Sequence, residues 1–502
     1  MAFSLAISRR KLFFAVQSCS LFLLVVYLTI TFNRLRSASH PVPGAHHVGF
    51  SATDNGRAGD GPGAPKDNWV PPSQAKHFAD ASRLLPSILD PSNTWIDRMT
   101  CPAMNETRYG YLRADPDSGK HEYVFALNIR EAADLTPRLL GSIIEAITFL
   151  GPKHCALSIV EGNSHDGTLE VLRLLAGPLA KLGVAYWLVS SPLDPSAGDR
   201  IKKLAILRAL AIEPVTGTLP PKLRDAETND KEGRIHPPQP HTYWNLPRDP
   251  LTNTTLTDLR ASLSPTATVF FINDVAACTE DFLELAHQRR HQSADMVCAM
   301  DWAHNGETYT SADPIFFYDV WIARTMSGNI FFDIDPSYGS WEKATDLFPH
   351  DPLSRARMAA GLPFQVFACW NGAIAFGAAP LANHEMGFRA SRKLECEQGE
   401  AQLFCKDLWL TGHGKIAVVP SVNLQYTDAR GRQTKMQKGY VSEFVRGERG
   451  HREPAVGGEE SLDLSDLISW KGPPEKVMCM PTFGDQTWRA WDENSVDSDL
   501  DV

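Results

Sequence analysis

Several patterns that mark well-known protein classes are missing from this sequence. Its nine cysteines contain no Cys-x-x-Cys pair, which disfavours a zinc ribbon or a thioredoxin-like redox site. There is no long basic run, and 59 acidic residues outnumber 49 basic ones, so a general nucleic-acid-binding function is disfavoured. Neither a Gly-x-Ser-x-Gly elbow nor a recognisable pair of flanking catalytic carboxylates occurs, which weakens the case for a hydrolase.

What is present describes an ordinary globular chain. It has 502 residues, of which 43% are hydrophobic and 22% charged, with a net charge of -10. This length and composition suffice for a large core and exclude a wholly disordered protein. One large α/β domain with appendages is the simplest organisation, and no oligomeric state is predicted.

The N-terminus carries an apolar run at 12–32, of the length that a helix needs to cross a bilayer. Arg9, Arg10 and Lys11 precede it, which predicts a cytoplasmic tail at 1–11 and a luminal or extracellular remainder. A cleaved signal peptide is the alternative. The run is longer than the hydrophobic region of most signal peptides, and no small-x-small cleavage site directly follows it, which favours a membrane anchor.

A stem is predicted at 33–75, where Gly, Pro, Ala, His and Asp replace large apolar residues. The sequons at Asn105 and Asn253 suit a luminal glycoprotein. Eight cysteines follow the anchor, an even number that permits pairing in an oxidising lumen. Cys396 with Cys405 is the preferred pair because the two bracket a short loop, with free buried cysteines as the alternative.

The body alternates strand-like apolar runs with apolar residues at helical spacing. Strands are predicted at 122–129, 155–160, 184–189, 268–272 and 296–300, and helices at 139–147, after 167 as far as 182, at 200–212 and at 280–291. Repeated βα units favour a mostly parallel sheet flanked by helices. The Pro-rich polar stretch 213–261 is interpreted as a surface insertion.

In a parallel sheet the ligand site lies at the carboxyl ends of the strands. The turn that holds Glu161, Asn163 and Asp166 follows one strand, and its side chains suit the hydrogen bonds of a nucleoside. A plain turn with Asp166 or Thr168 capping the next helix is the alternative.

Asn273 and Asp274 follow the strongly apolar strand at 268–272. A carboxylate there suits Mn²⁺ or Mg²⁺ that also grips a diphosphate, although a strand-ending turn gives the same pattern. Asp301, which ends the next strand, either approaches the same site or caps a turn.

Cations recur along the helix that begins at Arg200 and includes Lys203 and Arg208. Such side chains can neutralise a leaving diphosphate, and a solvated basic face is the alternative. Because these three segments follow successive strands, we expect them to line the same cleft.

A group of segments from Tyr123 to Tyr426 resembles one known family when taken in order. They read SIVEGNSHDGT, RIKKLAILRALA, TVFFINDVAACTEDFLEL, YDVWIARTMSG, CWNGAIAF, FRASRKLECE, LFCKDLW and IAVVPSVNLQY. They are similar to the fungal cryptococcal-type α-1,3-mannosyltransferase and capsule-associated protein family, glycosyltransferase family 69. The resemblance implies a type II Golgi membrane protein of the GT-A-like nucleotide-diphospho-sugar transferase fold, which transfers mannose from GDP-mannose to a mannoside of a glycan or capsule polysaccharide with Mn²⁺ or Mg²⁺.

The resemblance also implies roles for individual residues. Asn273 and Asp274 stand where the family has its metal motif, with Asp274 as the ligand, and the one carboxylate departs from the usual Asp-x-Asp pair. The remaining roles are donor binding for Glu161, Asn163, Asp166, Arg200, Lys203 and Asn273, acceptor binding for Trp370 and Asn371, acceptor contact or acid/base work for Glu395 and Asp407, and a late metal ligand in His413. A buried Trp core with an Asn-Gly turn is the alternative for Trp370 and Asn371.

These expectations place the catalytic domain at 76–426, with the insertion at 213–261, and a C-terminal extension at 427–502. An α-linked product from an α-linked donor means retention, either by double displacement or by a same-face route. Two alternative functions are a transferase with another nucleotide-sugar donor and a catalytically silent scaffold of the secretory pathway.

Overall fold

The computed structural model describes residues 72–196, 198–217, 228–229, 235–236, 242–245, 259–304, 314–337, 339, 341–450 and 464–493. The predicted tail and anchor, almost all of the predicted stem, and the sequon at Asn253 lie outside these residues. Within them, no helix is both long and apolar enough to span a membrane. Residues Val70–Val502 form one compact unit, and the predicted boundary at 426 lies inside it.

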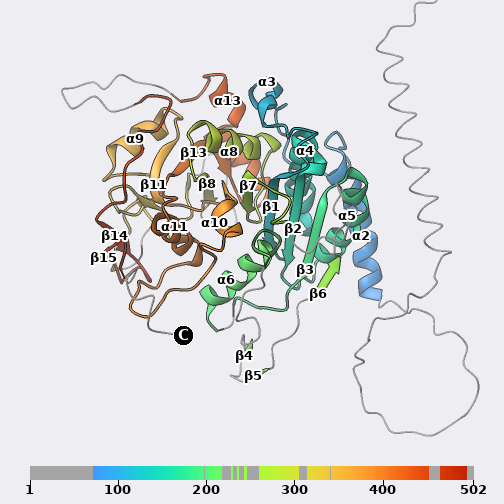
Figure 1. Cartoon of the computed structure of the whole chain (residues 1–502), viewed down its shortest axis with the longest axis horizontal. Coiled ribbons are helices and arrows are strands. Elements are labelled where there is room, and N and C mark those ends of the chain that lie inside the picture. The colour runs from blue at the N-terminus through green and yellow to red at the C-terminus, as the bar shows by residue number, and fades with distance from the viewer. Residues whose placement is uncertain are drawn as a thin grey trace, which may run out of the picture. The chain divides into compact units, whose positions relative to one another are not determined.

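The centre of the fold is one eleven-stranded sheet, whose strands lie side by side across the middle of Figure 1. Its strand order is β10-β11-β13-β8-β12-β7-β1-β2-β3-β6, and β9 pairs with β8 outside this path. Four neighbouring strands run parallel: β1 (His121–Ile129), β2 (Cys155–Glu161), β3 (Ala185–Ser190) and β7 (Leu263–Ile272). Every residue of β2 is buried, as expected for an interior strand covered on both faces.

The other half of the sheet is mixed, which corrects the expectation of a mostly parallel sheet. β12 (Ala373–Gly377) runs antiparallel between β7 and β8 (Met296–His304). The chain reverses before β12 at Asn371 and Gly372, whose φ angles are 53° and 82°. The remaining strands of the sheet are β6 (Thr242–Asn245), β9 (Ile315–Phe317), β10 (Arg324–Thr325), β11 (Phe364–Ala368) and β13 (Ile416–Leu424).

Helices cover both faces of the sheet. Along β1, Phe125 and Leu127 pack with one core cluster, which includes residues of α4, α5 and α8, whereas Val124 and Ala126 pack with the other, which includes residues of α6 and α11. The bounds are α2 (Pro72–Leu89), α3 (Glu106–Tyr109), α4 (Thr136–Leu150), α5 (Thr168–Leu182), α6 (Arg200–Ala211), α7 (Glu213–Thr216), α8 (Thr279–His291), α9 (Pro352–Ala359), α10 (Ala379–Ala382), α11 (Glu400–Leu410), α12 (Asp428–Lys438) and α13 (Val441–Val445). This two-sided cover confirms the predicted α/β class with a central sheet.

Two segments expected to be appendages contribute to the body. Within the stretch 213–261, β6 pairs with β3 at the sheet edge, and β4 (Thr228–Asn229) pairs with β5 (Ile235–His236). Near the C-terminus, β14 (Lys476–Cys479) and β15 (Thr487–Ala490) form a hairpin, which Figure 1 shows on the side of β11 and α11. The nitrogen of Met478 donates to the carbonyl of Gly328, which docks this hairpin on the body.

Three long-range disulfides cross-link the fold. They join Cys101 to Cys278, Cys298 to Cys369 and Cys396 to Cys479. The preferred pairing of Cys396 with Cys405 is therefore wrong, because Cys405 is buried on α11 and its thiol donates to the carbonyl of Cys369. Cys155 is also free and buried, so the expected alternative of buried thiols holds for two residues.

Candidate active site

A cleft of about 480 Å³ includes the end of β7 in its wall, which fits the rule for ligand sites in such sheets. Cations from α6, the N-terminus of α11, an aromatic turn and part of the C-terminal segment form the rest of the wall. The residues that line it are Arg200, Ile201, Leu204, Arg208, Asn273, Tyr318, Asp319, Trp321, Ile322, Trp370, Glu397, Gln398, Gly399, Glu400, Ala401, Tyr426, Met480 and Pro481.

Asn273 and Asp274 directly follow β7, as predicted, and of the two only Asn273 lines the cleft. The nitrogen of Asn273 donates to the carbonyl of Gly372 at 2.9 Å, and its side-chain oxygen accepts from the indole nitrogen of Trp370 at 3.2 Å. Burial raises the pKa of Asp274 to about 6, although the nearby charge of Arg208 opposes that shift. A half-buried carboxyl with a raised pKa is a candidate for binding a cationic group or for moving a proton.

Asp301 and Asp319 form a second acidic feature in this region. One oxygen of Asp301 accepts from the Tyr426 hydroxyl at 2.6 Å, and its other oxygen is buried without a hydrogen-bond partner among the described residues. An oxygen of Asp319 accepts from the nitrogen of Asn371 at 2.9 Å. Burial, followed by the charge of Asp319, raises the pKa of Asp301 well above the usual range, and burial raises the pKa of Asp319 to about 6.

Sequence reasoning considered Asp301 but missed Asp319, Tyr318 and Tyr426. The available signal was Tyr318-Asp319 directly after the apolar triplet of β9. The triplet is too short to predict a strand, and only the fold shows that the nitrogen of Tyr318 bonds the carbonyl of Asp301 at 3.2 Å.

The predicted basic helix does present cations to the cleft. Asp199 caps α6 by accepting from the nitrogen of Lys202 at 2.9 Å, and Arg200 begins the helix with an exposed side chain. Arg208 donates to a carboxylate oxygen of Glu400 at 2.7 Å, and its guanidinium lies 4.3 Å from the ring centroid of Trp370. Lys203 is different, because its ammonium donates to the carbonyl of Asp194 at 3.1 Å and does not line the cleft.

The predicted donor turn after β2 is held mainly by its own side chains. Glu161 is buried and accepts from the nitrogen of Ser164 at 2.5 Å and from the hydroxyl of Ser190 at 2.8 Å. Asp166 accepts from the nitrogens of Ala133 at 2.8 Å and Thr168 at 3.0 Å, which makes it part of a plain turn, whereas the N-cap of α5 is Gly167 and lacks a side-chain cap. Asn163 is exposed, and none of the three lines the cleft.

Trp370 and Asn371 lie within the cleft region but have little free surface. Trp370 is 1% exposed and Asn371 is fully buried. The Asn371 amide nitrogen donates to the carbonyl of Ala299 at 2.9 Å. A Cβ at Gly372 would lie 3.3 Å from the Cβ of Asp301, so glycine permits this close approach of the turn to β8.

Three other predicted residues lie outside the wall of the cleft. Glu395 and Asp407 both accept from the Arg389 guanidinium at 2.7 Å, and Lys406 donates to Glu395 at 2.7 Å. These contacts lower the pKa of Glu395 to about 2 despite its burial. His413 contacts Glu385 at 3.3 Å and Asp295 at 3.7 Å. Asp295 directly precedes β8, whereas Asp301 lies towards the other end of that strand, so the structure does not bring His413 to Asp274.

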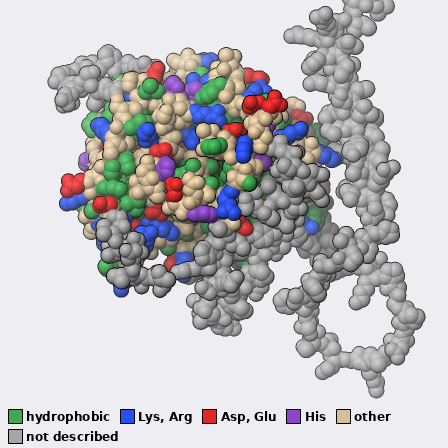
Figure 2. Space-filling model, in the orientation of Figure 1, with side chains coloured by type: hydrophobic (Ala, Val, Ile, Leu, Met, Phe, Trp, Pro, Cys, Tyr) green, Lys and Arg blue, Asp and Glu red, His purple; other side chains and the backbone are tan. Residues whose placement is uncertain are grey.

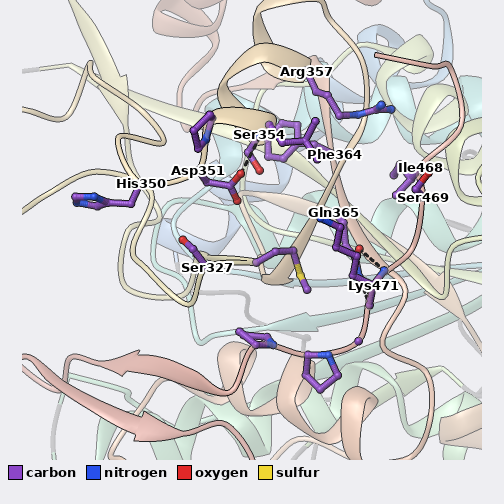
Figure 3. Close-up of a pocket in the computed structure, with 16 residues that line it drawn as sticks. Ser327, His350, Asp351, Ser354, Arg357, Phe364, Gln365, Ile468, Ser469 and Lys471 are labelled. Carbon is purple, nitrogen blue, oxygen red and sulfur yellow. Dashed lines mark hydrogen bonds between the residues drawn. The ribbon is translucent and has the colours of Figure 1, made fainter. Parts of the chain in front are cut away.

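A second hollow, of about 580 Å³, lies between the region of α9 and the segment 468–474 (Figure 3). Figure 3 shows the Gln365 side chain facing Lys471, whose backbone it bonds twice at 2.8 Å, and Asp351 capping α9 through the nitrogen of Ser354 at 3.0 Å. These polar groups hold the local structure together. No predicted site residue lines this hollow.

Asn105 is the sequon that the structure describes. Its side chain is exposed, and its oxygen accepts from the nitrogen of Arg108 at 3.1 Å, which caps α3.

Across the face shown in Figure 2, acidic and basic side chains are interspersed without one sign dominating.

Comparison with known proteins places these features in a family. A sequence model of the family described as cryptococcal mannosyltransferase 1 matches residues 122–407. The chain is also 30% identical, over 375 residues, to the α-1,3-mannosyltransferase CMT1 of Cryptococcus neoformans, a match that covers 72% of this chain and 69% of that protein.

Solved structures give weaker likenesses. GalNAc-T7 with UDP, GalNAc and Mn²⁺ is 12% identical, with a TM-score of 0.35 over 77% of this chain and 59% of that one. Residues 1–349 of Staphylococcus aureus TarS are also 12% identical, with a TM-score of 0.29 over 61% of this chain and 60% of that one. The chain thus spans about three fifths of these proteins, and scores this low do not establish a common fold.

The family match and the relative agree with the features assembled in the cleft. The matched range includes the β7 end, α6 and the first part of α11. The chain is therefore a glycosyltransferase that belongs to the cryptococcal mannosyltransferase 1 family.

Proposed function

We propose that the protein transfers mannose from GDP-mannose to a mannoside acceptor in α-1,3 linkage, with retention of configuration, on a GT-A-type framework. The observation that carries the proposal is the arrangement in the cleft, where Arg200 and Arg208 line the same space as Asn273 and Asp319. Cations suit a diphosphate, and carboxylates suit a metal or sugar hydroxyls. The relative named as an α-1,3-mannosyltransferase supports the choice of sugar and linkage.

Few protein side chains near this cleft could act as ligands of a divalent cation. Among the described residues, no group of three or more His, Cys, Asp or Glu side chains is placed to hold a metal. Mg²⁺ and Mn²⁺ often take only one or two protein carboxylates, together with waters and substrate phosphates. Asp274 is not in the cleft wall itself but is half-buried directly after the wall residue Asn273. It would hold the ion, which when bound would neutralise charge on the diphosphate.

The protein's own residues then provide positioning and charge. Arg200, exposed at the start of α6, reaches the leaving diphosphate, and Arg208 is oriented by Glu400 so that its charge stays fixed during the reaction. Glu400 is paired with Arg208, so Asp319 and Glu397 are the carboxylates of the cleft wall available for a double displacement, whereas a same-face route needs none. Electrostatic stabilisation of the departing GDP contributes most to the rate in either route.

We also propose that the protein acts in the Golgi lumen as a type II membrane protein. Three disulfides among the described cysteines support an oxidising compartment, and the exposed Asn105 side chain supports glycosylation there. Protease protection of the chain in sealed Golgi vesicles tests this, because digestion without detergent would contradict a luminal body.

The choice of donor is tested by calorimetry of the full-length protein with Mn²⁺ and a panel of GDP-mannose, GDP-fucose and UDP-sugars. Selective binding of GDP-mannose supports the proposal. Selective binding of another nucleotide sugar would replace the donor, and binding of none would favour the silent scaffold, an alternative that the small number of metal-binding carboxylates supports.

A further inference from the structure

Two aromatic side chains are unusually exposed in the wall of the cleft. Tyr318 is 47% exposed and Trp321 is 36% exposed, and both belong to the turn that follows β9. Single exposed aromatics are common on protein surfaces, but two neighbours that line the same polar cleft are a feature of ligand sites. Their position beside Asp319 connects them to the candidate site.

Trp321 is held in place by the C-terminal segment. The ring of Phe483 lies against it, with centroids 4.4 Å apart and planes at 34°. Phe483 lies in the loop between β14 and β15, and this hairpin is tied to the body by the Cys396–Cys479 disulfide and by Arg324, which donates to the carbonyl of Met478 at 2.8 Å. Met480 and Pro481 of this segment line the cleft as well, so the C-terminal segment builds one side of it.

Tyr318 is positioned from the opposite side. Its ring meets that of Tyr426 edge to face, with centroids 5.1 Å apart, and the Tyr426 hydroxyl is fixed by Asp301. Asp301 itself is fully buried, and the carboxyl that lines the cleft beside this aromatic surface is that of Asp319. This combination suits a pyranose, whose C–H groups pack on aromatic rings while its hydroxyls bond to carboxylates.

Trp370, the tryptophan that the sequence assigned to the acceptor, is a poorer surface for this purpose. It is 1% exposed, its indole nitrogen bonds Asn273, and the Arg208 guanidinium lies over its ring at 4.3 Å. A sugar would have to displace these contacts to pack on the ring. The exposed rings of Tyr318 and Trp321 need no such rearrangement.

We propose that Tyr318 and Trp321 form the acceptor subsite, and that Trp321, backed by Phe483, packs against the pyranose ring of the acceptor mannoside. This inference rests on the proposed function and adds the residues that recognise the acceptor. It also gives the C-terminal segment a direct part in acceptor binding.

Steady-state kinetics of the full-length enzyme, purified in detergent, test the subsite. Trp321→Ala should raise the acceptor KM about tenfold, and Trp321→Phe should raise it less because a ring is retained. Release of GDP from GDP-mannose without acceptor should stay within about twofold of the wild type in both variants, since the donor side is unchanged. Trp95→Ala, a control at a residue 77% exposed outside the cleft, should behave as wild type.

An acceptor KM that is unchanged in Trp321→Ala would overturn the inference and leave the proposed function standing. An equal loss of acceptor-free GDP release would also overturn it, because the residue would then support the fold or the donor site. Binding of methyl α-mannopyranoside, followed by saturation-transfer NMR, separates the two proposals. A signal that Trp321→Ala and Tyr318→Ala abolish supports the subsite even when no transfer from GDP-mannose is detected, and a signal that both variants keep contradicts it.

Discussion

The guanidinium of Arg208 donates to the carboxylate of Glu400 at 2.7 Å across the candidate site, joining α6 to the first residue of α11. Both side chains are largely buried, with 12% and 4% of their surface exposed. The pair fixes a positive charge beside Trp370 and Asn273 in the wall of the cleft. This relationship gives the first prediction.

Replacing Arg208 by Ala should lower kcat/KM for mannosyl transfer about 100-fold, because a fixed charge near the diphosphate is lost. It should also lower the free energy of unfolding by about 3 kcal/mol, since Glu400 is left buried without its partner. Glu400→Gln, which keeps an acceptor oxygen for Arg208, serves as the matched variant and should lose far less activity. Wild-type kcat/KM in Arg208→Ala would show that this cation does not act on the donor.

Asp274 gives a prediction about metal. Asp274→Ala should abolish the rise of activity with Mn²⁺ while the protein keeps its melting temperature, because the carboxyl is only half-buried. Activity titrations from EDTA-treated enzyme measure this, with Asp492→Ala, an exposed carboxylate near the C-terminus, as the control. A normal Mn²⁺ response in Asp274→Ala would remove this residue as the ligand.

The buried carboxyls Asp301 and Asp319 predict a pH-dependent stability. Because their pKa values are raised in the folded state, the folded protein binds more protons than the unfolded chain between about pH 4 and the folded values. Stability from these groups therefore falls as the pH rises through about 6 for Asp319, and continues to fall for Asp301. Asp301→Asn removes one charge of the pair and should relieve this loss.

Urea denaturation with EDTA at pH 5 and pH 7.5 measures the effect. Relative to wild type, Asp301→Asn should be stabilised more at pH 7.5 than at pH 5. A difference between variant and wild type that is the same at both pH values would contradict the raised pKa values.

The Arg389 cluster predicts a structural rather than a chemical effect. Arg389→Ala should lower the free energy of unfolding by about 3 to 5 kcal/mol, because Glu395 and Asp407 lose their shared guanidinium. Asp407→Asn, which retains a side-chain oxygen as an acceptor for Arg389, should keep most of the transfer activity. A loss of kcat beyond about 100-fold in a stable Asp407→Asn protein would instead support the acid/base role implied by family resemblance.

The Cys396–Cys479 disulfide predicts a link between the C-terminal segment and acceptor binding. The cysteines are 83 residues apart in sequence, so Cys479→Ser should cost about 4.5 kcal/mol on the chain-entropy account. It should also raise the acceptor KM, because the bridge holds the segment that carries Phe483. Cys405→Ala, at a free buried thiol, is the control, and an unchanged acceptor KM in Cys479→Ser would separate the disulfide from the site.

Local sequence patterns were sufficient for much of the parallel part of the fold. The apolar run before Asn273 predicted the second half of β7, and the pattern after Asp199 predicted α6 at nearly its observed position, since burial and helical spacing act over neighbouring residues. The antiparallel strand β12 was missed. Its five residues form a short apolar run, and such a run carries no information about the direction of a strand in the sheet. Only the pairing with β7 and β8 fixes its direction.

The site was harder to predict because its contacts are distant in sequence. Asn273 and Trp370 are 97 residues apart, and Phe483 reaches Trp321 from the C-terminal segment. No periodicity records such pairs. The same limit explains the wrong pairing of Cys396 with Cys405, which relied on closeness in sequence, whereas the true partner Cys479 is brought near by the β14–β15 hairpin.

The most direct test of the account is turnover by the full-length protein with GDP-mannose and simple α-mannosides, with and without Mn²⁺. The account predicts metal-dependent release of GDP together with a new α-1,3-linked mannoside, identified by NMR of the product. A product in which mannose is joined through another linkage would contradict the account, and so would turnover that is unchanged by EDTA. A folded protein that binds neither GDP-mannose nor Mn²⁺ would also contradict it.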